Sequence, residues 1–330
     1  MALQGRARFG SKLTQAISLI TAFLTIGAIC AIPSRAWISA AQVPQSTSGE
    51  PWPNELTHWR PRAENPVFSG RGGTFWDQKI RERGWILVDG DTWHLWYTGY
   101  NTDRTPLHML GHATSKDGIR WTRDSEAPDH STSWVEDMCV MRDGDQWVMF
   151  AEGAGDIAHQ LVSNDGKHWT DLGRLDIRRV NGSPIADGPR GTPTVWHENG
   201  KWYLFYERGD RGVWLATSPD RNLWTNVQDD PVIPLGPELY DSQAVALNQI
   251  IKRGNWYYGI THANAHRPWK DWTTCLVRSR DLVHWEKYPG NPLVMDNASS
   301  GLLIDPDGDG PARLRLYTMH PAVRAYESQP

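Results

Sequence analysis

The sequence predicts an all-β protein, a five-bladed β-propeller whose ring is closed by an N-terminal strand that completes the last blade. Two observations carry this prediction: a strand-turn-strand unit recurs along the chain, and a Ser-x-Asp-x-x-x-Trp motif recurs with it. Repeats of about 50 residues that each hold about four short strands are typical of propeller blades. With 330 residues, 39% of them hydrophobic, the chain is long enough for one domain with a sizeable core.

The clearest copy of the unit runs from Arg190 to Trp224. Short runs rich in Val, Trp, Tyr and Phe alternate there with Asn-Gly and Gly-Asp turns, which is the pattern of antiparallel strands in a meander. The second run of this copy contains Trp202, which has counterparts at Trp93, Trp147, Trp256 and, more weakly, Leu314. Successive positions in this series lie 54, 55, 54 and 58 residues apart, so the sequence predicts five blades.

The Ser-x-Asp-x-x-x-Trp motif marks the later part of four blades. Its copies are Ser115/Asp117/Trp121, Ser163/Asp165/Trp169, Ser218/Asp220/Trp224 and Ser279/Asp281/Trp285. The fifth blade lacks the motif, whereas the segment 57–68 near the N-terminus has the Trp and Pro spacing of an outermost strand. We expect this segment to complete the fifth blade, because a ring otherwise leaves an open sheet edge.

The N-terminus has the pattern of an export signal. Arg6, Arg8 and Lys12 precede an apolar stretch at 16–32, and small residues at 39–41 offer a cleavage site. We therefore predict a signal peptide over 1–41, a Pro/Ser-rich linker over 42–55 and the propeller over 56–330. The alternative is an uncleaved anchor. A cleaved leader predicts a secreted or periplasmic protein that has no membrane contact afterwards.

Charge and cysteine content narrow the partners. Lys and Arg number 34 against 38 Asp and Glu, and no basic run follows the leader, so nucleic acid is not an expected partner. Cys139 and Cys275 fall in different predicted blades and are expected to be buried thiols rather than a disulfide. Most of the 19 Trp are expected to pack the blades, with a few available to bind sugar.

No cofactor is predicted to be required, and no metal is expected among the site residues. The segment 305–310 resembles a calcium loop, with Asp305, Asp307 and Asp309 as ligands. Its twelfth position is Leu316 rather than Glu, and a hairpin turn is the competing interpretation of this segment.

Candidate site residues lie where the first strand of a blade starts and where its second strand ends, because both positions open on the same face of a propeller. First-strand starts supply Asp77, Gln78, Glu136, Asp137, Asp187, Arg190, Thr192 and Asp241, and second-strand ends supply Thr98, Glu152, Glu207, Arg208, His262 and His320. Crowded acids separate their pKa values into an acid and a base. The competing interpretation is that these acids cap turns on a solvated rim.

These positions resemble those of the five-bladed propeller glycosidases, the superfamily of glycoside hydrolase families 32, 43, 68, 117 and 130. The resemblance covers almost the whole mature chain and is closest in character to families 43 and 117 and to the N-terminal domain of family 32. The segment Phe-Trp-Asp-Gln-Lys-Ile matches at Asp77, Glu-Asp-Met-Cys-Val at Asp137 and Tyr-Asp-Ser-Gln-Ala-Val-Ala at Asp241. The resemblance implies a nucleophile or base at Asp77, a transition-state stabiliser at Asp137 and a substrate contact at Asp241.

The chain departs from this pattern in the third blade. Families 32 and 43 begin that blade with a general-acid Glu, and here the segment 190–193 reads Arg-Gly-Thr-Pro. The proton could instead come from Glu136, which we rank first, from Glu207, or from His262 or His320. We expect Gln78, Asp187, Arg190, Thr192, Arg208, His262 and His320 to bind substrate.

The resemblance implies an exported glycoside hydrolase that cleaves a plant or algal poly- or oligosaccharide with paired carboxylates. A carbohydrate-binding propeller without catalysis is one alternative, supported by the missing Glu of the third blade. A phosphorylase of the family 130 type is another. It would need cations for phosphate, and Arg190 and Arg208 are the candidates.

Overall fold

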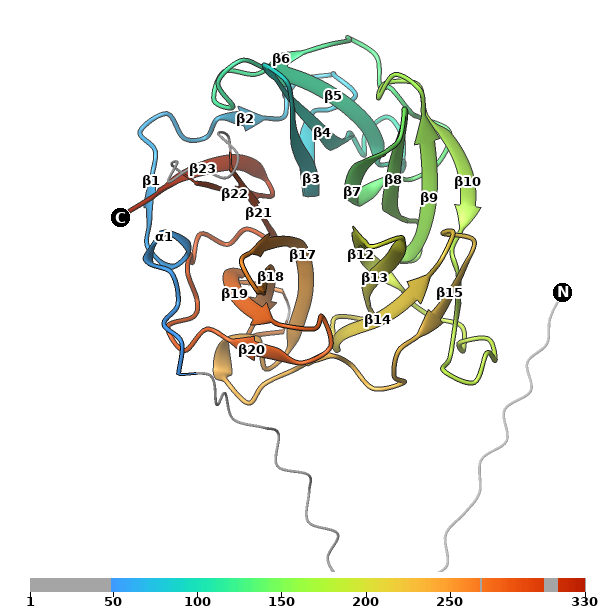
Figure 1. The fold of residues 1–330 in the computed structure, drawn as a ribbon. Coiled ribbons are helices and arrows are strands. Elements are labelled where there is room, and N and C mark those ends of the chain that lie inside the picture. The colour runs from blue at the N-terminus through green and yellow to red at the C-terminus, as the bar shows by residue number, and fades with distance from the viewer. Residues whose placement is uncertain (1–48, 268, 306–313, 330) are drawn as a thin grey trace, which may run out of the picture. The chain divides into compact units, whose positions relative to one another are not determined.

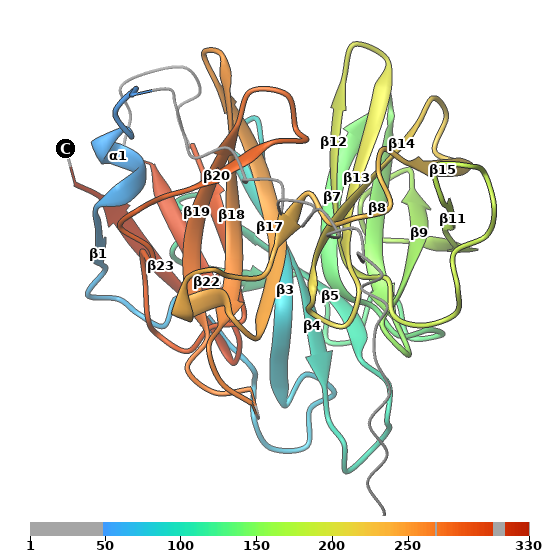
Figure 2. The same ribbon diagram turned by 90° about the horizontal axis from the view of Figure 1, so that it is seen from below.

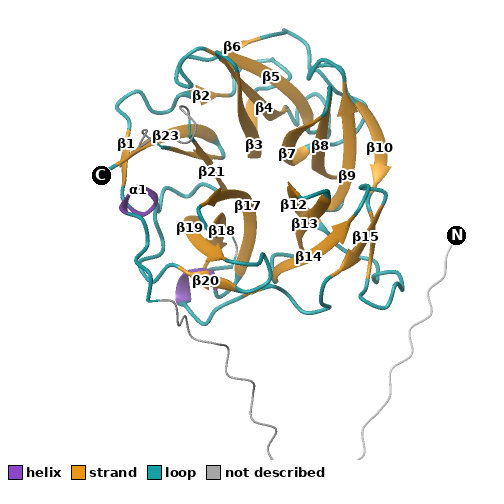
Figure 3. Ribbon diagram, in the orientation of Figure 1, coloured by secondary structure: helices purple, strands orange, loops and turns teal. Residues whose placement is uncertain are grey.

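The computed structural model describes residues 49–267, 269–305 and 314–329. In these residues the strands form five sheets that are arranged as a ring (Figure 1). The helices described are limited to α1 (Asn54–Thr57) and the 3-10 helix η1 (Leu239–Asp241), as Figure 3 shows. The predicted five-bladed propeller is therefore confirmed. None of the helices in the described ranges is long and apolar enough to cross a membrane.

Blades I to IV each contain four consecutive antiparallel strands, ordered from the centre of the ring outward. Blade I contains β3 (Lys79–Asp89), β4 (Thr92–Tyr100), β5 (Met109–Ser115) and β6 (Thr122–Arg123). Blade II contains β7 (Glu136–Asp143), β8 (Gln146–Gly153), β9 (Ile157–Ser163) and β10 (Thr170–Arg174). Blade III contains β12 (Gly191–Glu198), β13 (Lys201–Glu207), β14 (Gly212–Ser218) and β15 (Leu223–Asn226). Blade IV contains β17 (Ala244–Arg253), β18 (Trp256–Asn264), β19 (Thr273–Ser279) and β20 (Trp285–Lys287).

Blade III gains two short edge strands, since β11 (Asp176–Arg178) pairs in parallel with β15 and β16 (Ile233–Pro234) pairs with β14. The innermost strands β3, β7, β12, β17 and β21 each contact the next around the ring (Figure 1). Figure 2 shows the blades in the view turned by 90°, with β3, β17, β7 and β12 near the middle of the molecule.

Blade V joins the two ends of the described chain. Its strands β21 (Ser300–Ile304), β22 (Arg315–Met319) and β23 (Ala322–Ser328) come from the C-terminal part, and the N-terminal β1 (Trp59–Pro61) and β2 (Phe68–Ser69) both pair with β23. The predicted closure by an N-terminal segment is confirmed, although two short strands make it rather than one.

The repeated residues serve the packing and the turns. Trp93, Trp147, Trp202 and Trp256 are all buried between strands. In the Ser-x-Asp motif, the Ser163 hydroxyl donates to Asp165 at 3.0 Å and Asp165 accepts the backbone N–H of His168 at 2.8 Å, which holds the turn between the third and fourth strands. Cys139 and Cys275 are buried free thiols, as predicted.

The innermost strands of blades I to III are irregular at equivalent places. Their pairing register shifts between Arg81 and Trp85, between Glu136 and Cys139, and between Gly191 and Thr194. Each irregularity holds a residue with positive φ, namely Glu82 (51°), Asp137 (46°) and Thr192 (43°). Bulges re-aim side chains, and non-glycine residues in this strained region concentrate at functional sites.

Arg83 ties four blades together at the ring centre. Its fully buried guanidinium donates to the carbonyl oxygens of Met138 at 3.1 Å, Pro193 at 2.7 Å and Asn248 at 2.8 Å, and to the Thr194 hydroxyl at 2.6 Å. Burial lowers the pKa of Arg83. The carbonyl ligands compensate for the lost hydration of this cation, so the side chain supports the strands that carry the irregular residues.

Candidate active site

Six carboxyl groups gather near these irregular strand starts. Glu82 comes from β3, Glu136 and Asp137 from β7, Glu152 from β8, Glu207 from β13 and Asp210 from the loop after β13. We call these six residues the axial acidic cluster. The side chains influence one another's ionisation, and Glu136, Asp137, Glu152 and Glu207 are buried. Such crowding in a site of low dielectric constant separates the pKa values of the members.

Within the axial acidic cluster, Glu82 has three partners that stabilise its ionised form. Ser299 Oγ donates to its Oε2 at 2.6 Å, Arg81 Nη2 lies 3.2 Å from its Oε1, and His320 Nδ1 lies 3.5 Å from the same oxygen. Burial raises the pKa of Glu82, but His320, Arg81 and Ser299 outweigh it and lower the pKa to about 2. Glu82 is therefore a carboxylate at neutral pH.

Glu136 is also held by cationic or polar partners. Arg81 Nε lies 2.9 Å from Glu136 Oε2, and His108 Nδ1 lies 2.7 Å from the same oxygen. The His108 ring is packed against Trp134, with their ring centroids 3.7 Å apart. Arg81 thus links two acids of neighbouring blades, and its charge is shared between Glu82 and Glu136.

Asp137 has the opposite surroundings. Its side chain has one polar contact among the described residues, in which the backbone N–H of Arg83 donates to Oδ1 at 3.2 Å. Burial raises the pKa of Asp137 well above its ordinary range, and the charges of Glu82 and Glu136 raise it further. The pKa values of Asp137 and Glu82 are therefore shifted in opposite directions, that of Asp137 toward the protonated carboxylic acid and that of Glu82 toward the carboxylate.

Glu152 and Glu207 meet over Gly191 at the start of blade III. A Cβ atom on residue 191 would lie 2.2 Å from Glu152 Oε2 and 2.6 Å from Glu207 Oε1. The backbone N–H of Thr192 donates to Glu152 Oε2 at 2.8 Å. Burial raises the pKa of Glu207 to about 8, and burial together with the charges of Asp137 and Glu136 raises that of Glu152 well above its usual range. Acids of the second strands thus fill the space beside the position where the blade III Glu is missing.

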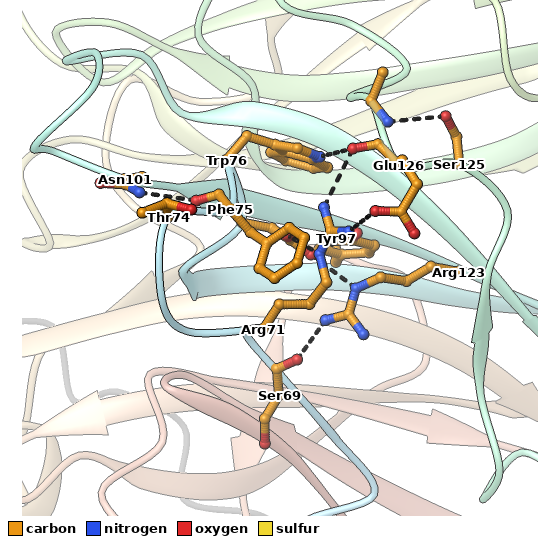
Figure 4. Close-up of polar contacts among 12 residues, drawn as sticks. Ser69, Arg71, Thr74, Phe75, Trp76, Tyr97, Asn101, Arg123, Ser125 and Glu126 are labelled. Atoms are coloured by element: carbon orange, nitrogen blue, oxygen red, sulfur yellow. Dashed lines mark hydrogen bonds and ion pairs between the residues drawn. The ribbon is translucent and has the colours of Figure 1, made fainter.

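Asp77 lies in a different environment, which we call the Asp77 ion-pair cluster. Its other members are Arg71, Arg123 and Tyr97, which are labelled in Figure 4. The fully buried Asp77 carboxylate accepts hydrogen bonds from Arg71 Nε at 2.5 Å, Arg123 Nε at 2.7 Å and the Tyr97 hydroxyl at 3.1 Å. Arg123 also donates to the carbonyl of Ser69 on β2. This cluster joins blade I to the N-terminal strand, and the catalytic role of Asp77 stays a prediction.

The other predicted residues divide between the axial acidic cluster and the periphery. His320, Thr192, Glu136, Asp137 and Glu207 come together in or beside the cluster. Four other predicted residues make contacts elsewhere or are exposed. Asp241 forms an ion pair with Lys287, and the Gln78 side chain donates to Gly73 O at 2.8 Å. The Arg208 guanidinium carbon lies 5.9 Å from the Trp214 ring centroid, and Asp187 is exposed. Arg190 is half-buried, and its backbone N–H donates to Asp156 O at 2.6 Å.

His262 is buried and neutral. Its Nδ1 lies 3.0 Å from the Asn248 amide nitrogen, and burial lowers the pKa of His262 to about 4. A neutral imidazole beside the cluster can accept or donate one hydrogen bond, but it does not supply a positive charge to the acids.

Sequence reasoning missed Glu82, Arg81 and Asp210. The irregular part of β3 holds three residues, 82–84, between its paired positions, whereas the equivalent parts of β7 and β12 hold two. A count backward from Trp93 by the distances that separate Glu136 and Asp137 from Trp147 would have selected Glu82 and Arg83, instead of Asp77.

Asp305 is the one predicted calcium ligand within the described residues, and its Oδ2 lies 2.9 Å from Arg253 Nη2. Asp307 and Asp309 lie outside the described residues, as do the signal peptide predicted for 1–41 and the first part of the linker. No group of three potential metal ligands occurs in the described ranges. The calcium site and the signal peptide stay predictions.

Comparison with known proteins supports the fold. No family model matches the chain. An uncharacterised protein of Mycobacterium tuberculosis is 28% identical over 135 residues, a match that covers 37% of this chain and 44% of that protein. The 1,2-beta-oligomannan phosphorylase of Thermoanaerobacter sp. is 24% identical over 220 residues, covering 61% of this chain and 70% of the phosphorylase.

Solved structures with the same fold include carbohydrate-active enzymes. A glycosyl hydrolase from Bacteroides ovatus superposes with a TM-score of 0.64 at 15% identity, covering 81% of this chain and 92% of the hydrolase. The beta-1,2-mannobiose phosphorylase of Listeria innocua, in complex with beta-1,2-mannobiose, superposes with a TM-score of 0.60 at 15% identity, covering 82% and 96%. The chain thus shares the five-bladed propeller fold of these enzymes, and this fold is the one that the sequence predicted.

Proposed function

We propose that this protein is an exported carbohydrate-active enzyme that cleaves a glycosidic bond in an oligo- or polysaccharide by hydrolysis. One observation carries the proposal. Glu82 and Asp137 occupy equivalent strained positions on adjacent innermost strands, and their surroundings drive their pKa values in opposite directions. A neutral acid beside an ionised carboxylate is what glycoside cleavage requires.

Each member of the pair would have a distinct role. Asp137 would donate its proton to the glycosidic oxygen as the bond to the anomeric carbon breaks. Glu82 would either take a proton from the attacking water or attack the anomeric carbon itself, and Ser299 and Arg81 would hold its carboxylate in place. Glu152 and Glu207, neutral over Gly191, would offer hydrogen bonds to sugar hydroxyls.

Phosphorolysis is the second candidate, and the names of the Thermoanaerobacter and Listeria proteins favour it. In that reaction phosphate replaces water as the nucleophile and Asp137 remains the proton donor. The phosphate would need a free cation. Within the described residues the side chains of Arg190 and Arg208, the two predicted cations, have neither a hydrogen bond nor an ion pair, so both are candidates for that role.

The test is release of reducing sugar or sugar phosphate from a panel of plant and algal polysaccharides and from β-1,2-mannobiose, with and without inorganic phosphate. We expect Asp137→Asn and Glu82→Gln each to lower kcat by about 10²–10⁴-fold, the usual contribution of a general acid or base. Asp145→Asn, in the exposed turn between β7 and β8, is the matched control and should keep full activity.

The outcomes separate the candidates. Product formed without phosphate supports hydrolysis, and product that requires phosphate supports phosphorolysis. Full activity in Asp137→Asn would overturn the assignment of the acid. Sugar binding without turnover on any member of the panel would favour a carbohydrate-binding propeller instead.

A further inference from the structure

Two tryptophans outside the axial acidic cluster, Trp269 exposed and Trp272 half-buried, form an aromatic surface. Trp269 and Trp272 lie in the connection between β18 and β19, with ring centroids 5.5 Å apart and planes 25° apart. Trp269 is 41% exposed, and the Arg267 guanidinium carbon lies 4.5 Å from its ring centroid. We call these two residues the Trp269–Trp272 platform. An indole left in water at this extent exposes apolar surface that a ligand can cover.

The platform is directly connected to the axial acidic cluster. Trp272 meets His262 edge to face, with ring centroids 5.0 Å apart and planes at 90°. His262 in turn contacts Asn248 of the innermost strand β17, and the charge of Glu82 acts on its pKa. The platform therefore contacts His262, a side chain that is close enough to Glu82 for the charge of Glu82 to act on its pKa.

A cleft adjoins the platform and carries polar groups. Its volume is about 510 Å³, within the usual range for small-ligand sites, and it is lined by Asp271, Trp272, Thr273, Met295, Asp296 and Asn297. Asn297 Oδ1 accepts the backbone N–H of Trp272 at 3.1 Å, which fixes the aromatic residue against the start of blade V. The Asp271 carboxylate has no hydrogen bond or ion pair within the described residues, so its oxygens are available as acceptors.

The connection that holds the platform is one of the two longest between the second and third strands of a blade. It spans 265–272 in blade IV and is as long as 101–108 in blade I, whereas the corresponding connections of blades II and III span 154–156 and 208–211. Hydroxyl acceptors beside an apolar aromatic face suit a sugar ring, which has polar edges and a C–H face. A purely apolar partner would leave Asp271 and Asn297 without a ligand.

We infer that the Trp269–Trp272 platform is a distal sugar-binding subsite, in which a sugar ring stacks on Trp269 and its hydroxyls reach Asp271. The inference rests on the proposed function and specifies its substrate: an oligosaccharide that extends from the axial acidic cluster past His262 over blade IV. The platform contributes binding energy and takes no part in bond cleavage.

The test compares substrates of different length. Trp269→Ala, Trp269→Tyr and Leu172→Ala are assayed with β-1,2-linked mannose and β-1,4-linked xylose series from the disaccharide to the tetrasaccharide, by titration calorimetry and product release. We expect Trp269→Ala to raise KM and Kd for the longer members about tenfold, with kcat on the disaccharide unchanged and with affinity restored in Trp269→Tyr. Leu172, an exposed apolar residue on β10, is the control that should change neither value.

Loss of the same size at every length, or no loss at any length, would overturn the subsite while the proposed cleavage stands. No product from either series and none from the polysaccharide panel would overturn the subsite and the proposed function together. A melting temperature equal to that of wild type shows that a loss in Trp269→Ala is not caused by unfolding.

Discussion

The Asp77 ion-pair cluster and the axial acidic cluster each contain a carboxylate from the start of blade I. The two clusters differ in how the negative charge is compensated. Asp77 has two guanidinium partners and a phenol within 3.1 Å of its one carboxylate. The axial acidic cluster has six acids, and Arg81 is shared between two of them. In the Asp77 ion-pair cluster, adjacent arginines compensate the negative charge. In the axial acidic cluster, some acids have a cationic partner and others do not.

The compensation of charge around a buried carboxylate helps to distinguish structural acids from catalytic candidates. A buried carboxylate that pairs with adjacent guanidinium groups leaves those cations uncompensated when it is removed, so its loss is expected to destabilise the fold. Acids that share few partners have pKa values shifted apart, lowered for Glu82 and raised for Asp137, and shifts of this kind are common at functional sites. Burial alone does not distinguish the two cases.

The largest expected effect in this comparison comes from Asp77→Asn. The substitution leaves Arg71 and Arg123 partly buried without their shared anion, so we expect the free energy of unfolding to fall by about 3–5 kcal/mol. Urea unfolding measures this. Glu126→Gln, which removes the exposed carboxylate on the same Arg71, is the matched control and should cost about 1 kcal/mol or less. Lost turnover at unchanged stability would instead support the catalytic role that the sequence predicted for Asp77.

The second prediction concerns pH and stability. The folded pKa of Glu207 is about 8 against an ordinary value of 4.5, so the folded state keeps a proton that the unfolded state releases. Its contribution to stability is complete below the ordinary value and is lost as pH rises through about 8. The free energy of unfolding should fall with pH in that window by up to about 1.4 kcal/mol per unit.

Glu207→Gln tests this prediction, because it removes the titrating proton while keeping the shape of the side chain. We expect a shallower decline of stability with pH in the variant, measured by urea unfolding at several pH values. Part of the decline should remain, because the pKa of Asp210 is also raised, to about 6. Parallel curves for wild type and variant would contradict the assignment.

The smallest expected effect is a shift in a pH profile. His320→Gln removes one of the partners that hold the pKa of Glu82 at about 2, so that pKa should rise. The acidic limb of the kcat/KM profile should move to higher pH, with the plateau little changed. His284→Gln, in an exposed turn of blade IV, is the control. An unchanged acidic limb would mean that Glu82 is not the ionised group of the reaction.

The fold could be predicted because its signals are local and repeated. The series Trp93, Trp147, Trp202 and Trp256 and the Ser-x-Asp turns occupy the same places in successive blades, and each turn is closed by its own residues. The closure of blade V could be predicted from two features. The N-terminal segment has the pattern of an outer strand but precedes the first blade, and the last blade has no outer strand of its own. Short-range chemistry determines such features, so the sequence alone contained them.

The candidate site could be predicted only in part. The sequence located Glu136, Asp137, Glu207 and His320 at strand ends that meet, because period and strand order fix those ends. Only the tertiary structure decided that Asp77 faces two arginines and that Glu82 faces the other acids. The register shift in β3 determines which side chains of this strand face the other acids. Residues of blades that are far apart in sequence determine the pKa of each acid. Neither the bulge nor these contacts could be predicted from the sequence alone.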